Sequence, residues 1–389
     1  MKPHMSFQVM SDTHVAEDPS HVNSINFDQA LKDILKTAPD SDGIMHVGDV
    51  TDSGHPGQFK TMASIWERNK AGLPPVYFTT GNHDVRWADF EERMASFRNA
   101  TGIDQLYYDV WIKGYHFIFL GTEKPLKDCA YLSADQLAWF DMKIAENSAP
   151  DKPIFIFVHE PMMNTVAGAQ TRNGWHGIRQ DRELKTILSK YPQSILFTGH
   201  THWELGSKDT IYNAKYATLF NVPSVAYLWT DEDAYKDGSQ GYYVDVYDDH
   251  VLVKGRDFAN GSWISEATYR IPMPPQIPVV DPKTDPDMTL GNPTMQLDKR
   301  HYLVGEPIHV TYAGSLNKDA FGIFPRGAVP NEVRQIEPLA FILTNTVQQP
   351  DGMLTFEHLT LPPGEYDMIY LGETMHVELT RLPFEVTAG

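Results

Sequence analysis

The chain has 389 residues, of which 41% are apolar and 21% charged, so it is long enough for two or three globular domains with sizeable cores. Its formal net charge is −19 and no Lys- and Arg-rich stretch offsets it, which argues against nucleic-acid polymers as partners because phosphate backbones are bound through basic surfaces. A small phosphate ester held by metal ions is compatible with this charge, whereas the single cysteine, Cys129, excludes an intrachain disulfide framework.

The N-terminal residues MKPHMSFQVMSDTH contain no apolar run of the length found in signal peptides. No stretch of the sequence approaches the roughly 20 apolar residues of a membrane-spanning helix. We therefore expect a cytoplasmic protein without a membrane span.

Short apolar runs alternate with helical patterns in the first two thirds of the chain, which indicates an α/β domain with a largely parallel sheet. The expected strands are residues 6–10, 43–47, 75–79, 115–120, 154–158 and 194–198. Apolar residues at helical spacing predict a helix over 27–35 with Asn26 as its cap. A capping-box pattern at Ser133 and Gln136 predicts another helix, and residues 242–257 predict a β-hairpin.

Seven prolines fall within residues 272–293, which predicts an extended linker and a domain boundary. We therefore expect an α/β domain over 1–270, a linker over 271–294 and a small all-β domain over 295–389. The last domain contains short apolar runs separated by Gly and Pro turns, at residues 307–312, 340–344, 353–357, 366–371 and 376–379. This pattern predicts a small, immunoglobulin-like β-sandwich.

Five polar clusters lie at or just beyond strand ends. They are residues 12–14 (DTH), 48–49 (GD), 81–84 (GNHD), 158–161 (VHEP) and 199–202 (GHTH). Ligands in open α/β sheets bind at the carboxyl ends of the strands. The five clusters therefore predict one shared site at that edge.

In this order the five clusters resemble the calcineurin-like metallophosphoesterase superfamily. The segments GDVTDSG and GNHDVR, with the LSADQLAWF run, are most similar to its bacterial class III cyclic-nucleotide phosphodiesterase branch. The resemblance implies a four-layer α/β/β/α sandwich in residues 1–270 that hydrolyses phosphate esters with a hydroxide bridging two metal ions. One departure is Glu160, which stands where many members have a second histidine.

The resemblance also implies the metal ligands, with Asp49 bridging the two ions. They are Asp12, His14, Asp49, Asn82, His159, His200 and His202. Imidazole, carboxylate and amide donors without thiolate suit manganese, iron or zinc. Asp52 stands where purple acid phosphatases carry an iron-binding tyrosine, so the chain is not expected to be a purple enzyme.

Other site residues are expected around this metal pair. By resemblance, His83 is the general acid that protonates the leaving oxygen, because a histidine titrates near neutrality. Asp84 is expected to orient the His83 ring. Arg86 is a candidate for binding the substrate phosphate, and Asn164 and His176 are candidates for the rim of the pocket.

The substrate remains open within one chemical class. Hydrolysis of a small phosphodiester of the cyclic-nucleotide type is the leading interpretation, and phosphomonoesterase or nucleotidase activity is the alternative. A non-catalytic binding scaffold is a third reading, disfavoured because all seven ligand positions are occupied. The C-terminal domain is expected to pack on the catalytic domain, shaping its mouth or mediating self-association into a homo-oligomer; carbohydrate or surface binding is the alternative.

Overall fold

The computed structural model describes residues 2–86, 89–171, 177–278, 280–281, 284–286, 290–330, 336–344, 350–372 and 377–389. Two six-stranded sheets form the N-terminal part, with the strand orders β14-β13-β12-β1-β2-β3 and β4-β5-β6-β7-β9-β8. The first sheet contains β1 (Met5–Met10), β2 (Ile44–Val47), β3 (Val76–Thr79), β12 (Gln240–Val246), β13 (His250–Asp257) and β14 (Ser262–Pro272). The second contains β4 (Tyr108–Ile112), β5 (Tyr115–Phe119), β6 (Ile154–Phe157), β7 (Ser194–Thr198), β8 (Ile211–Tyr212) and β9 (Thr218–Asn221).

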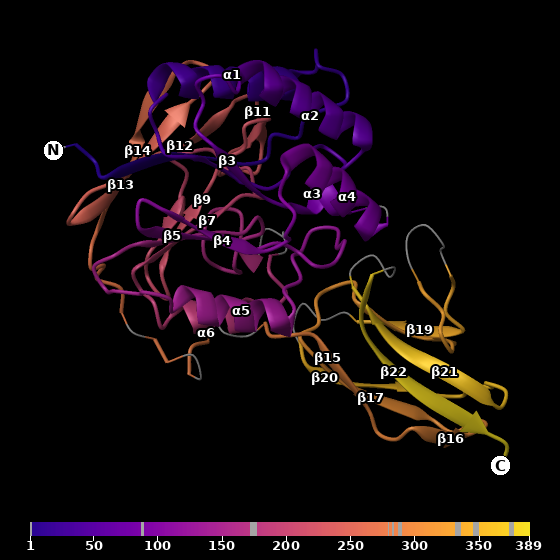
Figure 1. Ribbon diagram of the computed structural model, residues 1–389. Helices are drawn as coiled ribbons and strands as arrows, with labels where there is room; N and C mark the ends of the chain where they lie inside the picture. Colours follow the sequence, from indigo (N-terminus) through magenta and orange to yellow (C-terminus); the bar gives the residue numbers. More distant parts are fainter. Residues whose placement is uncertain are drawn as a thin grey trace.

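Helices lie on the outer faces of these two sheets (Figure 1). The helices are α1 (Val22–Thr37), α2 (Pro56–Asn69), α3 (Asn82–Val85), α4 (Phe90–Thr101), α5 (Ala134–Ile144) and α6 (Asp181–Leu188). One apolar core packs α1, α2 and α4 on the first sheet, and another packs α5 and α6 on the second. The predicted α/β fold is confirmed.

A third core lies between the two sheets and is rich in phenylalanine. Phe7 of β1 packs edge-on against Phe117 and Phe155 of the second sheet, with ring centroids 5.1 and 4.9 Å apart. Edge-to-face aromatic packing adds to the free energy gained from burying the rings. Because the central strands are covered on both faces, they read in the sequence as continuous apolar runs.

The residues after the proline-rich segment form many strands in two further sheets, beside the N-terminal part in Figure 1. One sheet contains β15 (Thr294–Leu297), β17 (Ile308–Ala313) and β20 (Gly352–Phe356). The other contains β16 (His301–Leu303), β18 (Ala320–Pro325), β19 (Ala340–Leu343), β21 (Gly364–Leu371) and β22 (Glu378–Thr387). The all-β character of this region was expected; β15, β16 and β18 were not among the predicted strands, nor were β4, β8, β9 and β14 of the two N-terminal sheets.

Two local predictions needed correction. Helix α1 starts at Val22 behind a His21 cap, and Asn26 lies inside the helix, where its amide donates to the carbonyl oxygen of Ala226 at 3.0 Å. Ser133 does cap α5, but the Gln136 side chain turns away to bond Gly121 and does not close a capping box. In both cases a tertiary partner outcompetes the local one.

The predicted hairpin is present as β12 and β13. None of the described helices is both long and apolar enough to cross a membrane.

Candidate metal centre

The polar clusters lie at the carboxyl ends of strands from both sheets. Asp12, Asp49 and Asn82 follow β1, β2 and β3 of the first sheet, whereas His159 and the pair at 200 and 202 follow β6 and β7 of the second. The facing packing of the two sheets brings these ends together, so that residues 190 positions apart in the chain share one buried site.

The backbone at this site is unusual. Five of the candidate ligands have φ in the left-handed region, a conformation that non-glycine residues seldom adopt. They are Asp12 (φ 53°), His14 (φ 40°), Asp49 (φ 50°), His200 (φ 70°) and His202 (φ 60°). Such conformations cost free energy and persist where the surrounding structure enforces them, which is typical of functional sites.

Two motif glycines allow the loops to approach one another. A Cβ on Gly81 would lie 2.2 Å from Oδ1 of Asp49, and a Cβ on Gly199 would lie 2.5 Å from Oδ2 of Asp12. A side chain at either position would therefore push a carboxylate out of the site.

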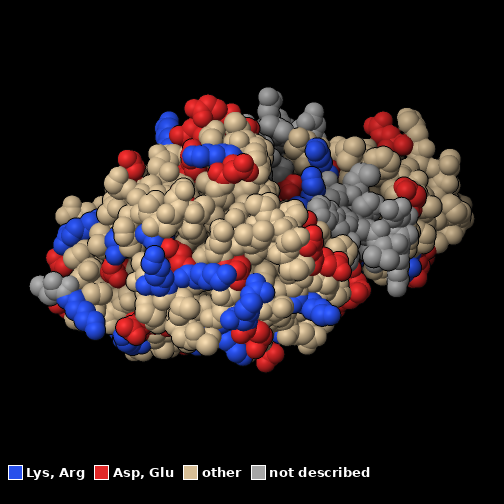
Figure 2. Space-filling view, turned by 90° about the horizontal axis from the view of Figure 1, so that it is seen from above, with Lys and Arg blue, Asp and Glu red and all other residues tan. Residues whose placement is uncertain are grey.

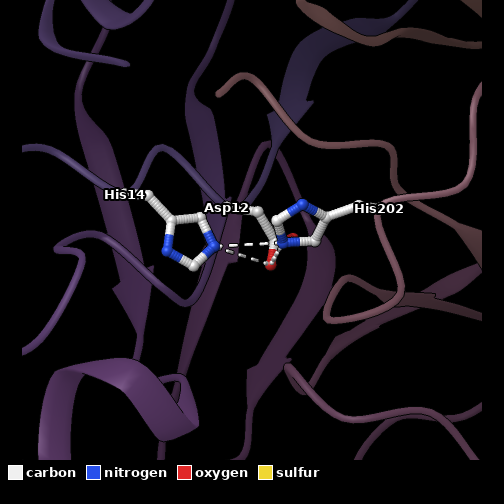
Figure 3. A group of neighbouring side chains, drawn as sticks. All are labelled: Asp12, His14 and His202. Atoms are coloured by element: carbon white, nitrogen blue, oxygen red, sulfur yellow. Dashed lines mark hydrogen bonds and ion pairs between the residues drawn. The ribbon is translucent and has the colours of Figure 1, made fainter. Parts of the chain in front are cut away.

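One group of ligand atoms joins Asp12, His14 and His202 (Figure 3). The Nε2 atoms of the two histidines are 3.0 Å apart, and Oδ1 of Asp12 lies 3.0 Å from His202 Nε2 and 3.7 Å from His14 Nε2. All three side chains are buried. Oδ2 of Asp49 adds a fourth possible ligand atom, 3.7 Å from His14 Nε2.

A second group joins Asp12, Asp49 and His159. Nε2 of His159 is 3.1 Å from Oδ2 of Asp49 and 3.7 Å from Oδ1 of Asp12. Beside it, the carboxamide oxygen of Asn82 lies 3.2 Å from Nδ1 of His200. Asp12 belongs to both groups, and Oδ2 of Asp49 in the second group also lies 3.7 Å from His14 Nε2 in the first, so both carboxylates lie between the two groups.

The donor set fits divalent cations. Within the described residues, Oδ1 of Asp12 and Nε2 of His159 are buried and form no hydrogen bond of good geometry, although each lies 3.0–3.1 Å from another candidate ligand atom; buried polar atoms are normally paired. His159 Nδ1 lies 2.6 Å from the carbonyl oxygen of Val47, so Nδ1–H donates and Nε2 is left to bind a metal. Imidazole nitrogens and carboxylate oxygens are ligands that divalent metals bind, and here they lie in two adjoining groups.

The buried carboxylates and imidazoles shift one another's pKa values. Burial opposes ionisation of Asp49, but the neighbouring His159 and His83 outweigh it and hold the pKa of that carboxyl well below its ordinary value. Burial likewise opposes protonation of His159, yet Asp49 and Asp12 raise its pKa above the ordinary range. A proton and a metal ion compete for the same nitrogen, so metal affinity falls as pH falls.

His83 lies at the mouth of the site, with Nε2 4.0 Å from Oδ2 of Asp49. Its Nδ1 is 2.6 Å from the carbonyl oxygen of Asp52, and its Nε2 accepts a hydrogen bond from the Arg86 guanidinium. Burial, with additional repulsion from His14 and Arg86, lowers the pKa of His83 to about 4 despite the opposing Asp49. The ring is therefore neutral at pH 7.

Asp84 is expected to orient the His83 ring, but the hydrogen bonds of its carboxylate among the described residues run to two loops. Its carboxylate accepts hydrogen bonds at 2.9–3.2 Å from the backbone N–H groups of Gly81, Val50 and Thr51 and from the Thr51 hydroxyl. Burial and the nearby Asp49 raise the pKa of Asp84 to about 6, which these donors partly offset. Asp84 instead ties the loop after β2 to the loop after β3, and so acts on the site through Asp49.

The three candidate substrate-binding residues differ in where they lie relative to the metal ligands. Arg86 is nearly buried beside His83, with NH1 2.8 Å from the carbonyl oxygen of Lys127. Asn164 is exposed, although residues 165–169 after it are buried, and its Oδ1 accepts from both the backbone and the hydroxyl of Thr171 at 2.9 Å. His176 lies outside the described residues. Arg86 is thus placed beside the metal groups, whereas the Asn164 oxygen is engaged within its own loop.

An aromatic wall beside the metal groups was missed in the sequence. The ring of Tyr227 lies 4.5 Å from that of His202 and 5.9 Å from that of His14, and Tyr235 stacks on it at 5.6 Å. Tyr235, on the short ribbon of β10 (Leu228–Trp229) and β11 (Tyr235–Lys236), is 58% exposed. The segment YLWTDEDAY after the last motif was the available signal, but its rings carry no ligand chemistry of their own.

Three comparisons relate this chain to known proteins. A family model described as "Calcineurin-like phosphoesterase" matches residues 5–204. A "Probable glycerophosphodiester phosphodiesterase GpdQ" of Arcobacter nitrofigilis is 26% identical over 204 residues, covering 50% of this chain and 70% of that protein. A "3',5'-cyclic-nucleotide phosphodiesterase alr5338" of Nostoc sp. is 23% identical over 233 residues, covering 54% of this chain and 79% of the relative.

Among solved structures, the purple acid phosphatase PPD1 of yellow lupin (Lupinus luteus) seeds has a similar fold. The TM-score is 0.53 at 14% identity, over 69% of this chain and 53% of that chain. The likeness concerns the fold alone, and this chain spans about half the length of that phosphatase.

Proposed function

Since the chain belongs to the calcineurin-like phosphoesterase family, whose members are metal-dependent phosphoester hydrolases, we propose that it hydrolyses small phosphodiesters at a two-metal centre. The observation that carries this proposal is the pair of buried ligand groups that share Asp12 and that Asp49 approaches from both sides, 3.7 Å from His14 and 3.1 Å from His159. Asp12, His14 and His202 would hold one ion, and Asn82, His159 and His200 the other. Manganese, iron and zinc all suit these donors.

When bound, a pair of divalent ions supplies an activated water and neutralises charge on the phosphoryl group. The protein residues around them bind and orient the ester. Arg86, which now bonds His83, would hold a phosphate oxygen in place of that hydrogen bond. The negative charge of the ester would then favour the protonated His83 ring, which is in position to protonate the leaving oxygen.

The charge of the molecule supports a small substrate. On the face shown in Figure 2, basic and acidic side chains are interspersed and do not form a basic stripe. With the net charge of −19, this disfavours nucleic-acid polymers. The aromatic wall formed by Tyr227 and Tyr235 favours an ester with a planar group, such as a cyclic nucleotide, over a glycerophosphodiester.

A substrate panel with added manganese tests the reaction. We expect faster hydrolysis of bis-p-nitrophenyl phosphate and of 2′,3′- or 3′,5′-cyclic nucleotides than of p-nitrophenyl phosphate, because the family relatives are named as diesterases. The readout is kcat/KM for each ester. A monoester preference of about tenfold or more would select the phosphomonoesterase alternative and leave the family assignment intact.

A Tyr235→Ala variant tests the aromatic wall. Stacking of a base on an aromatic ring contributes about 1–3 kcal/mol, so KM for cyclic nucleotides should rise by about 5- to 150-fold with kcat little changed. Tyr235→Phe keeps the ring and serves as the matched control, and a glycerophosphodiester serves as the substrate without a planar group. Equal losses on both substrates would show that the wall does not recognise the base.

The finer architecture belongs to the same proposal. Three apolar cores support a four-layer α/β/β/α catalytic domain over residues 1–270, and the two C-terminal sheets support an immunoglobulin-like sandwich over 295–389 after a linker at 271–294. A non-catalytic scaffold remains the alternative of a different class, and measurable turnover in the panel excludes it.

A further inference from the structure

A loop over residues 122–131, between β5 and α5, lies between the candidate metal centre and the C-terminal strands. Its ends are tied together, because the backbone N–H of Glu123 donates to the carbonyl oxygen of Tyr131 at 2.9 Å and that of Tyr131 donates to Oγ1 of Thr122 at 3.0 Å. A loop closed in this way moves largely as one unit.

The tip of the loop contacts the metal centre through one backbone atom. The carbonyl oxygen of Lys127 accepts from Nδ2 of Asn82 at 2.5 Å and from NH1 of Arg86 at 2.8 Å. A carboxamide has one oxygen and one NH₂ group, so holding the NH₂ group on Lys127 aims the oxygen toward His200. The Lys127 carbonyl oxygen thus fixes the orientation of both the Asn82 carboxamide and the Arg86 guanidinium.

The opposite side of the same loop is part of the C-terminal core. Leu126 and Cys129 are buried among the apolar side chains of that core. Leu126 packs so closely on Gly372 that a Cβ there would lie 2.6 Å from Cδ2 of Leu126. The Lys124 ammonium donates to the carbonyl oxygen of Glu378 at 2.7 Å, so the loop is held where β21 ends and β22 begins.

A buried ion pair fixes the base of the loop to the same region. The backbone N–H of Arg179 donates to the carbonyl oxygen of Ala130 at 2.9 Å. The guanidinium of Arg179 binds both oxygens of Asp319, at 3.2 and 2.7 Å, and also donates to the carbonyl oxygen of Gly314 at 2.9 Å. Both charged groups are fully buried, and a buried bidentate pair holds its two chain segments in one relative position.

We propose that the C-terminal region is a positioning element of the metal centre, which it acts on through the 122–131 loop and the Lys127 carbonyl oxygen. The inference rests on the proposed assignment of Asn82 as a metal ligand. Its physical basis is that a ligand must be held within about 0.5 Å of its productive place, and this loop has little regular structure of its own to do so. The C-terminal core supplies the missing rigidity.

The test is Leu126→Ala in the full-length protein, with Leu361→Ala as the matched control. Leu361 is buried in the same core but precedes the start of β21, whereas Leu126 contacts its far end, about 20 Å away along the strand. For Leu126→Ala we expect faster amide hydrogen exchange in residues 122–131 and a metal affinity about 10- to 100-fold weaker at one of two sites, as for loss of an outer-shell partner. Leu361→Ala should keep both metal affinities and the loop protection.

Lys124→Met, which removes the hydrogen bond to Glu378 and the cation–π contact with Tyr131, is the milder second variant and should change both readouts in the same direction. Faster loop exchange with two wild-type metal affinities would overturn the inference, as would equal metal loss in Leu126→Ala and Leu361→Ala. If the wild-type protein takes up no metal in titration, the proposed function is overturned instead. Amide exchange of the loop does not depend on metal uptake, so the two failures can be told apart.

Discussion

An Asp49→Ala variant is expected to lose both metal ions and all measurable phosphoesterase activity. Asp49 contributes an oxygen to each ligand group, 3.7 Å from His14 Nε2 and 3.1 Å from His159 Nε2. Without it, two cations would face each other with no shared negative charge between them. The loss of affinity should therefore exceed the about 10- to 100-fold typical of outer-shell partners. Elemental analysis of the purified variant measures it directly.

The matched control for that variant is Asp33→Ala. Asp33 is also a mostly buried carboxylate, but it pairs with Arg256 at 2.6 Å between α1 and β13, away from the metal ligands. Its loss should lower the melting temperature and leave the metal content intact. Full metal content in folded Asp49→Ala would refute the assignment of Asp49 as the bridge.

A His83→Ala variant is expected to keep both metals while kcat falls by about 10²–10⁴-fold, the usual contribution of general acid catalysis. His83 lies at the mouth of the site, outside the two fully buried ligand groups, although its ring also comes within ligand distance of His14 and Asp52. The loss should be smallest for p-nitrophenyl esters, whose leaving group hardly needs a proton, and largest for nucleoside leaving groups. Comparing kcat across leaving groups of different pKa measures this dependence.

His200→Ala is the contrast for this experiment, since it removes a proposed ligand and should lower metal content and activity together on every substrate. Equal slowing of activated and unactivated esters by His83→Ala would assign His83 to holding the phosphate beside Arg86, and the proton donor would then be another group. Metal loss in His83→Ala would place it among the ligands.

The seven candidate ligands could be selected from the sequence because each lies in a short motif at or just beyond a strand end. Strand ends can be recognised from apolar runs, and the motif glycines mark where loops approach closely, as Gly81 and Gly199 do against the Asp49 and Asp12 carboxylates. The order of strands and helices, and with it the α/β fold, follows from the same local patterns.

The role of a side chain could not be predicted from local sequence patterns where it depends on a partner from elsewhere in the chain. Asp84 follows His83 directly, yet its carboxylate binds the backbone of the Asp49 loop, because three N–H groups converge on it only when β2 and β3 are paired. Asn26 has the chemistry of a helix cap, but the carbonyl oxygen of Ala226 reaches it in the folded chain.

The sequence by itself determined the chemical types of the candidate metal ligands, the placement of the motifs at strand ends and the all-β character of the C-terminal region. Only the tertiary structure decided that Lys127 positions Asn82 and that Tyr227 and Tyr235 line the site. The physical reason is that Lys127 acts through its backbone carbonyl, a group every residue carries, and that an aromatic side chain looks the same in a sequence whether it fills a core or faces a ligand.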